Sequence, residues 1–225
     1  MPYMPPGDAD SAQGELALIL HAQERILSAA QARALGMSAD AVRSKVDSGR
    51  WQRVHHGVYA TFTGDLPRRA RLWAAVLRCG HNAVLSHETA AEIHGLTRDP
   101  ASSIHVTVPL SSNPARLAGL AEVVVHRSAN WKADPQPPWN LPRTPVNVTV
   151  LDLVDGADNL DDAYAWLSRA ITERNTTAAA LRDALAERKK ISKRSWLADA
   201  LTDVSYGVAG DHEGAGAPGS APAPG

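Results

Sequence analysis

Apolar residues between positions 13 and 61 change from helical to strand-like spacing and back. Three of them recur at the spacing of a helix face and predict a first helix that ends near residue 23: Leu16, Ile19 and Leu20. The pair Ile26-Leu27 then predicts a short strand. The rest of this stretch predicts two further helices and two strands.

Capping residues define the second helix. Ser28 stands three residues before Gln31, which is the spacing of a capping box, in which each side chain bonds the backbone N–H of the other residue. The helix that begins there is expected to run to about Leu35, because Gly36 can adopt the left-handed conformation that ends a helix.

A third helix is predicted to follow at once. Ser38 is a favourable N-cap residue, and Gly49 stands where the helix would end. Val42 and Val46 are four residues apart, so they share one face, which we expect to be buried. Because neighbouring residues in a helix are about 100° apart, the side chains between the valines point outward.

A basic hairpin comes after the third helix. Residues 51–54 and 58–61 favour strands, with His56-Gly57 at the turn between them. This order of helices, turn and hairpin is that of a winged helix-turn-helix, which places one helix in the DNA major groove. The sequence therefore predicts a winged helix-turn-helix DNA-binding domain over residues 13–61.

Residues 65–205 predict a second domain, and the whole chain is expected to be of the α+β class. A helix with an apolar stripe should follow Pro67, and residues 104–108 and 122–126 predict a small antiparallel sheet. From Val148 onward the pattern is helical to about residue 204. We therefore expect an N-terminal winged helix-turn-helix followed by an α+β domain that ends in helices.

Both ends of the chain, residues 1–12 and 206–225, have a composition typical of disordered tails. Between them, an apolar content of 44% is sufficient for a core. The single cysteine, Cys79, lies in a helical pattern and is expected to be a buried apolar residue. No apolar run has the roughly 18 residues of a membrane span, and the N-terminus lacks the character of a signal peptide. We expect a cytoplasmic protein with no membrane partner.

Charge is segregated along the chain, although the formal net charge is only -1. Residues 13–78 contain ten Lys and Arg against five Asp and Glu, whereas residues 151–225 contain eight against twelve. A basic N-terminal third on a nearly neutral protein is expected when one module alone faces a polyanion.

The outward side chains of the third helix are the candidates for reading DNA. The N-terminal part of such a helix meets base edges, which nominates Ser38, Ala39, Asp40, Arg43 and Ser44 for base contact and Lys45 for a phosphate. Arg43 is the strongest candidate, because a guanidinium pairs in bidentate fashion with guanine. Phosphate contacts are expected from Gln31 and Arg33 on the second helix and from Arg50, Arg53, His55 and His56 on the hairpin.

The same pattern has a plainer interpretation. A helix with Arg and Lys on its outer face is often simply solvated, and winged folds also serve as protein-docking modules. Beyond the hairpin, Arg68, Arg71 and Arg78 fall within about 80° of one another around the predicted helix axis. A DNA phosphate or an acidic protein partner is expected beside them, with an ordinary solvated face as the alternative.

The sequence offers no set of catalytic residues. His87 and His94 share a helix face, but they are about 10 Å apart along the axis, so we expect hydrogen-bonded histidines and no metal site. A phosphate-binding glycine loop and a nucleophile elbow are both missing. We therefore expect a protein that is not an enzyme and needs no cofactor.

Several motifs occur together in the first module: Gln31-Ala32, Gly36-Met37-Ser38, Val42-Arg43, Gly49-Arg50-Trp51, Arg53-Val54 and Gly57-Val58-Tyr59-Ala60. They resemble the N-terminal winged-helix domain of AbiEi-type antitoxins, as found in actinobacterial regulators. A looser resemblance continues to about residue 204 through these stretches: Val84-Leu85-Ser86-His87, His94-Gly95-Leu96, residues 104–109 and Arg143-Thr144-Pro145.

This resemblance implies a transcriptional regulator that represses its own operon by binding repeats at the promoter. It also implies that the second domain neutralises a nucleotidyltransferase toxin. The expected partners are double-stranded DNA, such a toxin and a second copy of the chain. Many actinobacterial relatives carry a nuclease-like domain after this region, but no carboxylate-carboxylate-lysine set follows here, so nuclease activity is not implied. The alternative is a protein-binding antitoxin or scaffold whose winged helix does not read DNA.

Overall fold

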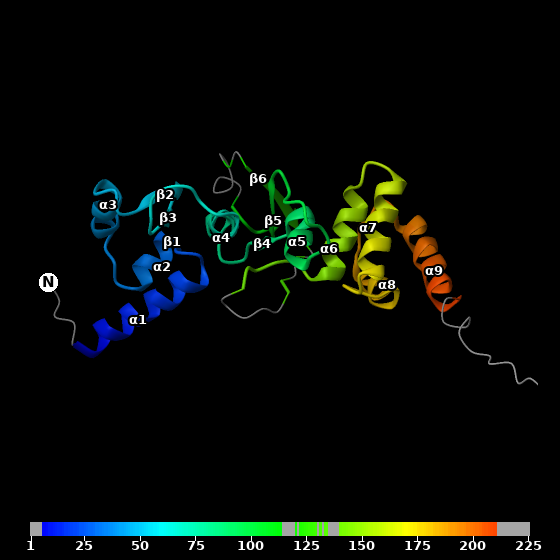
Figure 1. Ribbon diagram of the computed structural model, residues 1–225, viewed down its shortest axis with the longest axis horizontal. Coiled ribbons are helices and arrows are strands. Elements are labelled where there is room, and N and C mark those ends of the chain that lie inside the picture. Colours follow the sequence, from blue (N-terminus) through cyan, green and yellow to red (C-terminus); the bar gives the residue numbers. More distant parts are fainter. Residues whose placement is uncertain are drawn as a thin grey trace, which may run out of the picture. The chain divides into compact units, whose positions relative to one another are not determined.

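The computed structural model describes residues 6–113, 120, 122–129, 131, 133–134 and 140–210 (Figure 1). The chain divides into two compact units, Met1–Thr149 and Val150–Gly225. Helices and short strands occur together in the first unit, and helices make up the second, so the predicted α+β class is confirmed.

The first unit begins with three helices and three strands in the predicted order. The helices are α1 (Pro6–Ala22), α2 (Ala29–Ala34) and α3 (Ala39–Asp47), and the strands are β1 (Ile26–Ser28), β2 (Gln52–His55) and β3 (Val58–Ala60). The strands form an antiparallel sheet in the order β1-β3-β2. This arrangement is a winged helix-turn-helix.

The caps that the sequence indicated are present. Ser28 Oγ accepts a hydrogen bond from the Gln31 N–H at 3.2 Å, and Gln31 Oε1 accepts one from the Ser28 N–H at 3.0 Å, which completes the capping box of α2. Gly36 has φ +80°, the left-handed conformation expected after this helix. Ser38 Oγ caps α3 by accepting from the Ala41 N–H at 3.1 Å.

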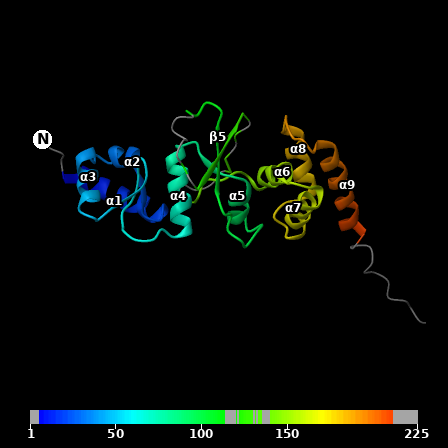
Figure 2. The ribbon, with the colours of Figure 1, turned by 90° about the horizontal axis from the view of Figure 1, so that it is seen from above.

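The first sheet is covered on both faces. Leu27 packs with Val42 and the helices on one face, whereas Ile26 and Val58 pack on the other face against α4 (Arg68–Cys79). Figures 1 and 2 show α4 between this sheet and a second sheet. Core residues therefore pack against both faces of the sheet that contains the hairpin.

The second sheet consists of β4 (Val84–Leu85), β5 (Ile104–Pro109) and β6 (Val123–Ser128), and α5 (His87–His94) connects the first two strands. β4 and β5 are antiparallel, but β5 and β6 are parallel, so the expectation of a purely antiparallel second sheet is wrong. About a dozen residues separate β5 from β6, which is long enough for a crossover to the same strand direction.

Cys79, at the end of α4, belongs to the core between the two sheets. Burial raises the pKa of its thiol to about 11, while neighbouring Arg78 opposes that shift. Since such a thiol stays protonated at neutral pH, Cys79 is a packing residue, as predicted.

The C-terminal part is helical, with α6 (Val146–Gly156), α7 (Leu160–Thr172), α8 (Ala178–Glu187) and α9 (Arg194–Gly210). In the second unit Leu167, Leu181 and Leu197 are fully buried. Arg188, after α8, reaches Asp152 of α6 with an N–O distance of 2.6 Å. No helix in the described part of the chain is long and apolar enough to cross a bilayer.

The terminal helices extend beyond the bounds that composition indicated. α1 starts at Pro6, inside the segment 1–12 expected to be disordered, and α9 continues to Gly210. Pro6 stands at the start of α1, where its missing N–H costs no hydrogen bond. The remaining parts of both predicted tails lie outside the described residues.

Candidate nucleic-acid interface

The outer face of α3 is open to solvent. The five residues nominated for base contact are all exposed: Ser38, Ala39, Asp40, Arg43 and Ser44. Val42 is buried among the helices and the first sheet, and Val46 packs beside it. The predicted division of α3 into a buried valine face and an outward polar face is confirmed.

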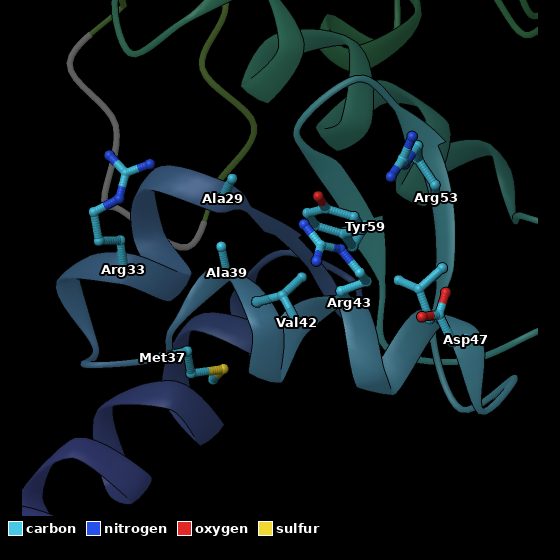
Figure 3. A pocket seen from close by; sticks show the side chains of 10 residues that line it. Ala29, Arg33, Met37, Ala39, Val42, Arg43, Asp47, Arg53 and Tyr59 are labelled. Carbon is cyan, nitrogen blue, oxygen red and sulfur yellow. The ribbon is translucent and has the colours of Figure 1, made fainter. Parts of the chain in front are cut away.

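A groove of about 170 Å³ lies between α2, α3 and the hairpin. Figure 3 shows arginines from three elements around it: Arg33 on α2, Arg43 on α3 and Arg53 on β2. Its other lining residues are mostly small, apolar or aromatic: Ala29, Met37, Ala39, Val42, Val46, Asp47 and Tyr59. The groove therefore combines an apolar floor with a mainly cationic border.

Arg43 is held loosely at the edge of this groove. Its Nη1 lies 3.1 Å from Asp40 Oδ1, and the two side chains are 69% and 86% exposed. Exposed ion pairs of this kind contribute little to stability and are screened by salt. The guanidinium can therefore leave Asp40 for a DNA base or phosphate at little cost.

Lys45 has a packing role that the sequence did not indicate. Its Nζ lies 5.4 Å from the ring centroid of Trp51, and this cation–π contact covers one of the most buried aromatic rings of the module. A phosphate would have to compete with Trp51 for the Lys45 ammonium group. Arg50 is exposed, and its Nε donates to Ser48 Oγ at 3.1 Å.

The side chain of Gln31 makes hydrogen bonds within the module. Its Oε1 accepts hydrogen bonds from Ser28, and its Nε2 donates to Gln23 Oε1 at 3.1 Å. Both ends of the amide therefore have partners inside the module, and a phosphate would have to displace one of them. Arg33, two residues further along α2, is exposed and lines the groove.

The basic residues of the hairpin differ in their exposure to solvent. Arg50, Arg53 and His56 are exposed, whereas His55 is half-buried. Burial lowers the pKa of His55, the Arg78 guanidinium lowers it further, and Glu122 only partly opposes these effects. His55 is therefore neutral at neutral pH and supplies no charge to a phosphate.

The lowered pKa of His55 predicts a loss of stability in acid. The folded protein binds a proton at His55 more weakly than the unfolded chain does. The free energy of unfolding is therefore not reduced by His55 above about pH 6.5, and it declines as the pH falls below that value. The urea concentration at the midpoint of unfolding, measured with EDTA present, should fall between about pH 7.5 and 5.5. It should fall less for His55→Gln than for the parent. His56→Gln, at an exposed neighbour, should retain the full drop. An equal drop in His55→Gln and the parent would contradict the assignment.

The three α4 arginines grouped together in the sequence analysis do not form one anion site. Arg68 makes a two-point ion pair with Glu92 of α5, with Nη2 2.8 Å from Oε2 and Nε 3.3 Å from Oε1. Both side chains are largely buried, so α5 supplies the anion expected for Arg68. Arg78 lies near His55, and Arg71 is exposed. Of the three, Arg71 is the residue that faces solvent and is open to a phosphate or a partner.

Tyr59 and Asp47 also line the groove, and Tyr59 was not nominated from the sequence. Tyr59 pairs with Arg53 in the β2–β3 register, so both project to the face of the sheet that carries the groove. Asp47 reaches the same groove from the last turn of α3. The alternation of the hairpin residues was the available signal for Tyr59. The expected hydrogen-bonded state of His94 is confirmed, because its Nε2 lies 2.8 Å from the Thr144 carbonyl oxygen.

The exposed third helix, the short hairpin and the basic groove between them define a winged helix-turn-helix of the DNA-binding class. Residues 15–61 match the family described as "Transcriptional regulator, AbiEi antitoxin". The resemblance noted in the sequence is therefore confirmed over these residues. The match includes α2, α3 and the whole hairpin, and it supports a DNA-binding regulator of antitoxin type. No curated protein matches the chain.

Proposed function

We propose that this protein is a sequence-specific DNA-binding repressor that acts in the cytoplasm on the promoter of its own operon. The observation that carries the proposal is the position of Arg33, Arg43 and Arg53 around one exposed groove. That groove lies entirely within the region that matches the antitoxin regulator family. The basic N-terminal third of the chain supports attraction to a polyanion.

The proposed contacts divide into base readout and positioning. The first turns of α3 enter the major groove, where Arg43 pairs with guanine and Ser38, Ala39, Asp40 and Ser44 lie closest to neighbouring base edges. Arg33, Arg50, Arg53 and His56 meet phosphates on both sides of that groove. Lys45 supports this surface by packing on Trp51.

In this proposal, the second unit and the part of the first unit outside the winged helix bind protein partners. The family match supports an antitoxin, and the partner proposed for it is a nucleotidyltransferase-like toxin. Two copies of the chain would occupy repeated half-sites at the promoter, since a single α3 reads only one. Arg71 on the exposed side of α4 is the candidate contact to a partner or to flanking phosphates.

Arg43→Ala tests the readout directly. By mobility shift on the protein's own promoter, the variant should lose roughly 10- to 100-fold in affinity, which corresponds to one bidentate base contact. Its affinity for unrelated DNA should change much less, so the ratio of promoter affinity to unrelated-DNA affinity should fall. Arg98→Ala removes the same charge from an exposed position outside α3 and the hairpin, and it should leave both affinities unchanged.

Two results would count against the proposal. If the parent protein shows no preference for its promoter, the alternative of a protein-binding antitoxin that does not read DNA is favoured. If Arg43→Ala weakens promoter and unrelated DNA by the same factor, Arg43 contacts phosphate and the base-reading role is wrong.

A further inference from the structure

Three histidines from separate segments converge on one face of the second sheet. His87 is the first residue of α5, His105 lies in β5 and His126 lies in β6. One ring nitrogen from each histidine lies within 4.8 Å of the other two. All three side chains are half-buried. The cluster is separate from the basic groove of the winged helix.

The fold explains why these residues meet. In the parallel β5–β6 register Thr107 is opposite His126, so His105 and His126 project from the same face. The start of α5 is attached to β5, because the Ser86 N–H donates to the His105 carbonyl at 3.0 Å and the His105 N–H donates to Thr89 Oγ1 at 2.9 Å. These bonds hold the His87 ring against the other two.

The distances in the cluster are those of ligands that share an ion. His105 Nδ1 lies 3.1 Å from His126 Nε2 and 3.2 Å from Glu88 Oε2. Nitrogen and oxygen ligands about 2.0–2.1 Å from a tetrahedral zinc ion stand about 3.3 Å from one another. Glu88 Oε2 is shielded from solvent and makes no hydrogen bond, although the rest of the Glu88 side chain is partly exposed. Glu88 therefore borders the cluster through His105, but its oxygens are not among the ligand atoms that gather within 4.8 Å.

The surroundings of His87 also fit a ligand. Its Nδ1 lies 3.0 Å from Ser86 Oγ, which in turn accepts a hydrogen bond from Thr107 Oγ1 at 2.8 Å. Metal-binding histidines commonly donate one ring N–H to such a partner and ligate with the other nitrogen, here Nε2. The backbone of His87 has φ +50°, a left-handed conformation that is costly for a residue with a side chain.

We propose that His87, His105 and His126 bind a divalent transition-metal ion of the zinc type. Three imidazoles favour zinc over magnesium or calcium, which prefer sites made of oxygen ligands, and a water molecule would complete a tetrahedral site. The rings of His87 and His126 stack with centroids 3.7 Å apart, so they tilt apart on binding to direct both lone pairs at the ion. The ion would join α5 to both parallel strands.

Zinc titration of the full-length, tag-free protein after EDTA treatment tests the site, with a chromophoric chelator as competitor. The parent should bind one zinc ion per chain. His105→Gln and His126→Gln should each weaken binding on the order of 100-fold. His81→Gln, which changes an exposed histidine outside the cluster, should bind like the parent.

Three further measurements separate a lost ligand from a lost fold. Circular dichroism in EDTA should be the same for the parent and the histidine variants, and zinc should raise the thermal midpoint of the parent but not of His126→Gln. Cobalt should give the intense visible absorption of a tetrahedral site in the parent and in His81→Gln only. Zinc binding that is absent from the parent, or unchanged in both His105→Gln and His126→Gln, would overturn the proposal.

Discussion

Trp51→Ala is expected to destabilise the winged-helix module severely and to abolish DNA binding. Trp51 is only 8% exposed and packs with Leu27, Ala32 and Val42 between the helices and the sheet. Its ring centroid lies 6.4 Å from that of Tyr59, and Lys45 covers it. Truncating a buried aromatic residue costs about 3–5 kcal/mol, because the packing is lost and a cavity remains. That cost is a large part of the 5–15 kcal/mol that typically stabilises a domain.

Urea unfolding monitored by circular dichroism, together with binding to promoter DNA, checks this result. Trp51→Ala should unfold at a lower urea concentration and show no shifted band. Trp196→Ala changes a partly exposed tryptophan in the second unit and should leave DNA affinity unchanged. A Trp51→Ala protein with the parent's unfolding midpoint and DNA affinity would show that this ring is not the centre of the module.

Steep weakening of DNA binding by salt is the second large effect that we expect. If Arg33, Arg50 and Arg53 each neutralise a phosphate, the logarithm of the binding constant falls against the logarithm of salt concentration with a slope of roughly -3. Affinity should therefore drop about 40-fold between roughly 50 and 200 mM salt. The drop should occur on promoter and unrelated DNA alike, because phosphate contacts carry no direct sequence information.

Single variants assign the charges that produce this slope. Arg50→Ala and Arg53→Ala should each reduce its magnitude by about one unit. His55→Gln should leave the slope unchanged at neutral pH, because burial and Arg78 keep His55 uncharged. Fluorescence anisotropy with labelled duplexes over a series of salt concentrations measures these slopes. A His55→Gln slope reduced as much as that of Arg50→Ala would contradict the neutral state of His55.

Local rules were sufficient to predict the DNA-binding module. The bounds of α2 follow from Ser28, Gln31 and Gly36, which act within one or two helical turns. The exposed face of α3 follows from the spacing of Val42 and Val46. Each of these signals depends on residues close together in the sequence, so one sequence was enough to interpret them.

The features that sequence reasoning missed depend on contacts that form only in the folded chain. Arg68 pairs with Glu92, 24 residues away, and that partner changes Arg68 from an expected anion ligand into a link between two helices. Gln31 reaches Gln23, and Lys45 reaches Trp51, only once the module has folded. His87, His105 and His126 lie far apart in the sequence, and the parallel pairing of β5 with β6 brings two of them to one face. The spacing test applied to His87 and His94 could not detect such a cluster.

The position of α4 determines how events at the two sheets are coupled. Because this helix packs on the first sheet with one part of its surface and on β4 and β5 with another, the hairpin and the second sheet form one body. Any shift of α4 against one sheet would therefore be transmitted through its packing to the other sheet.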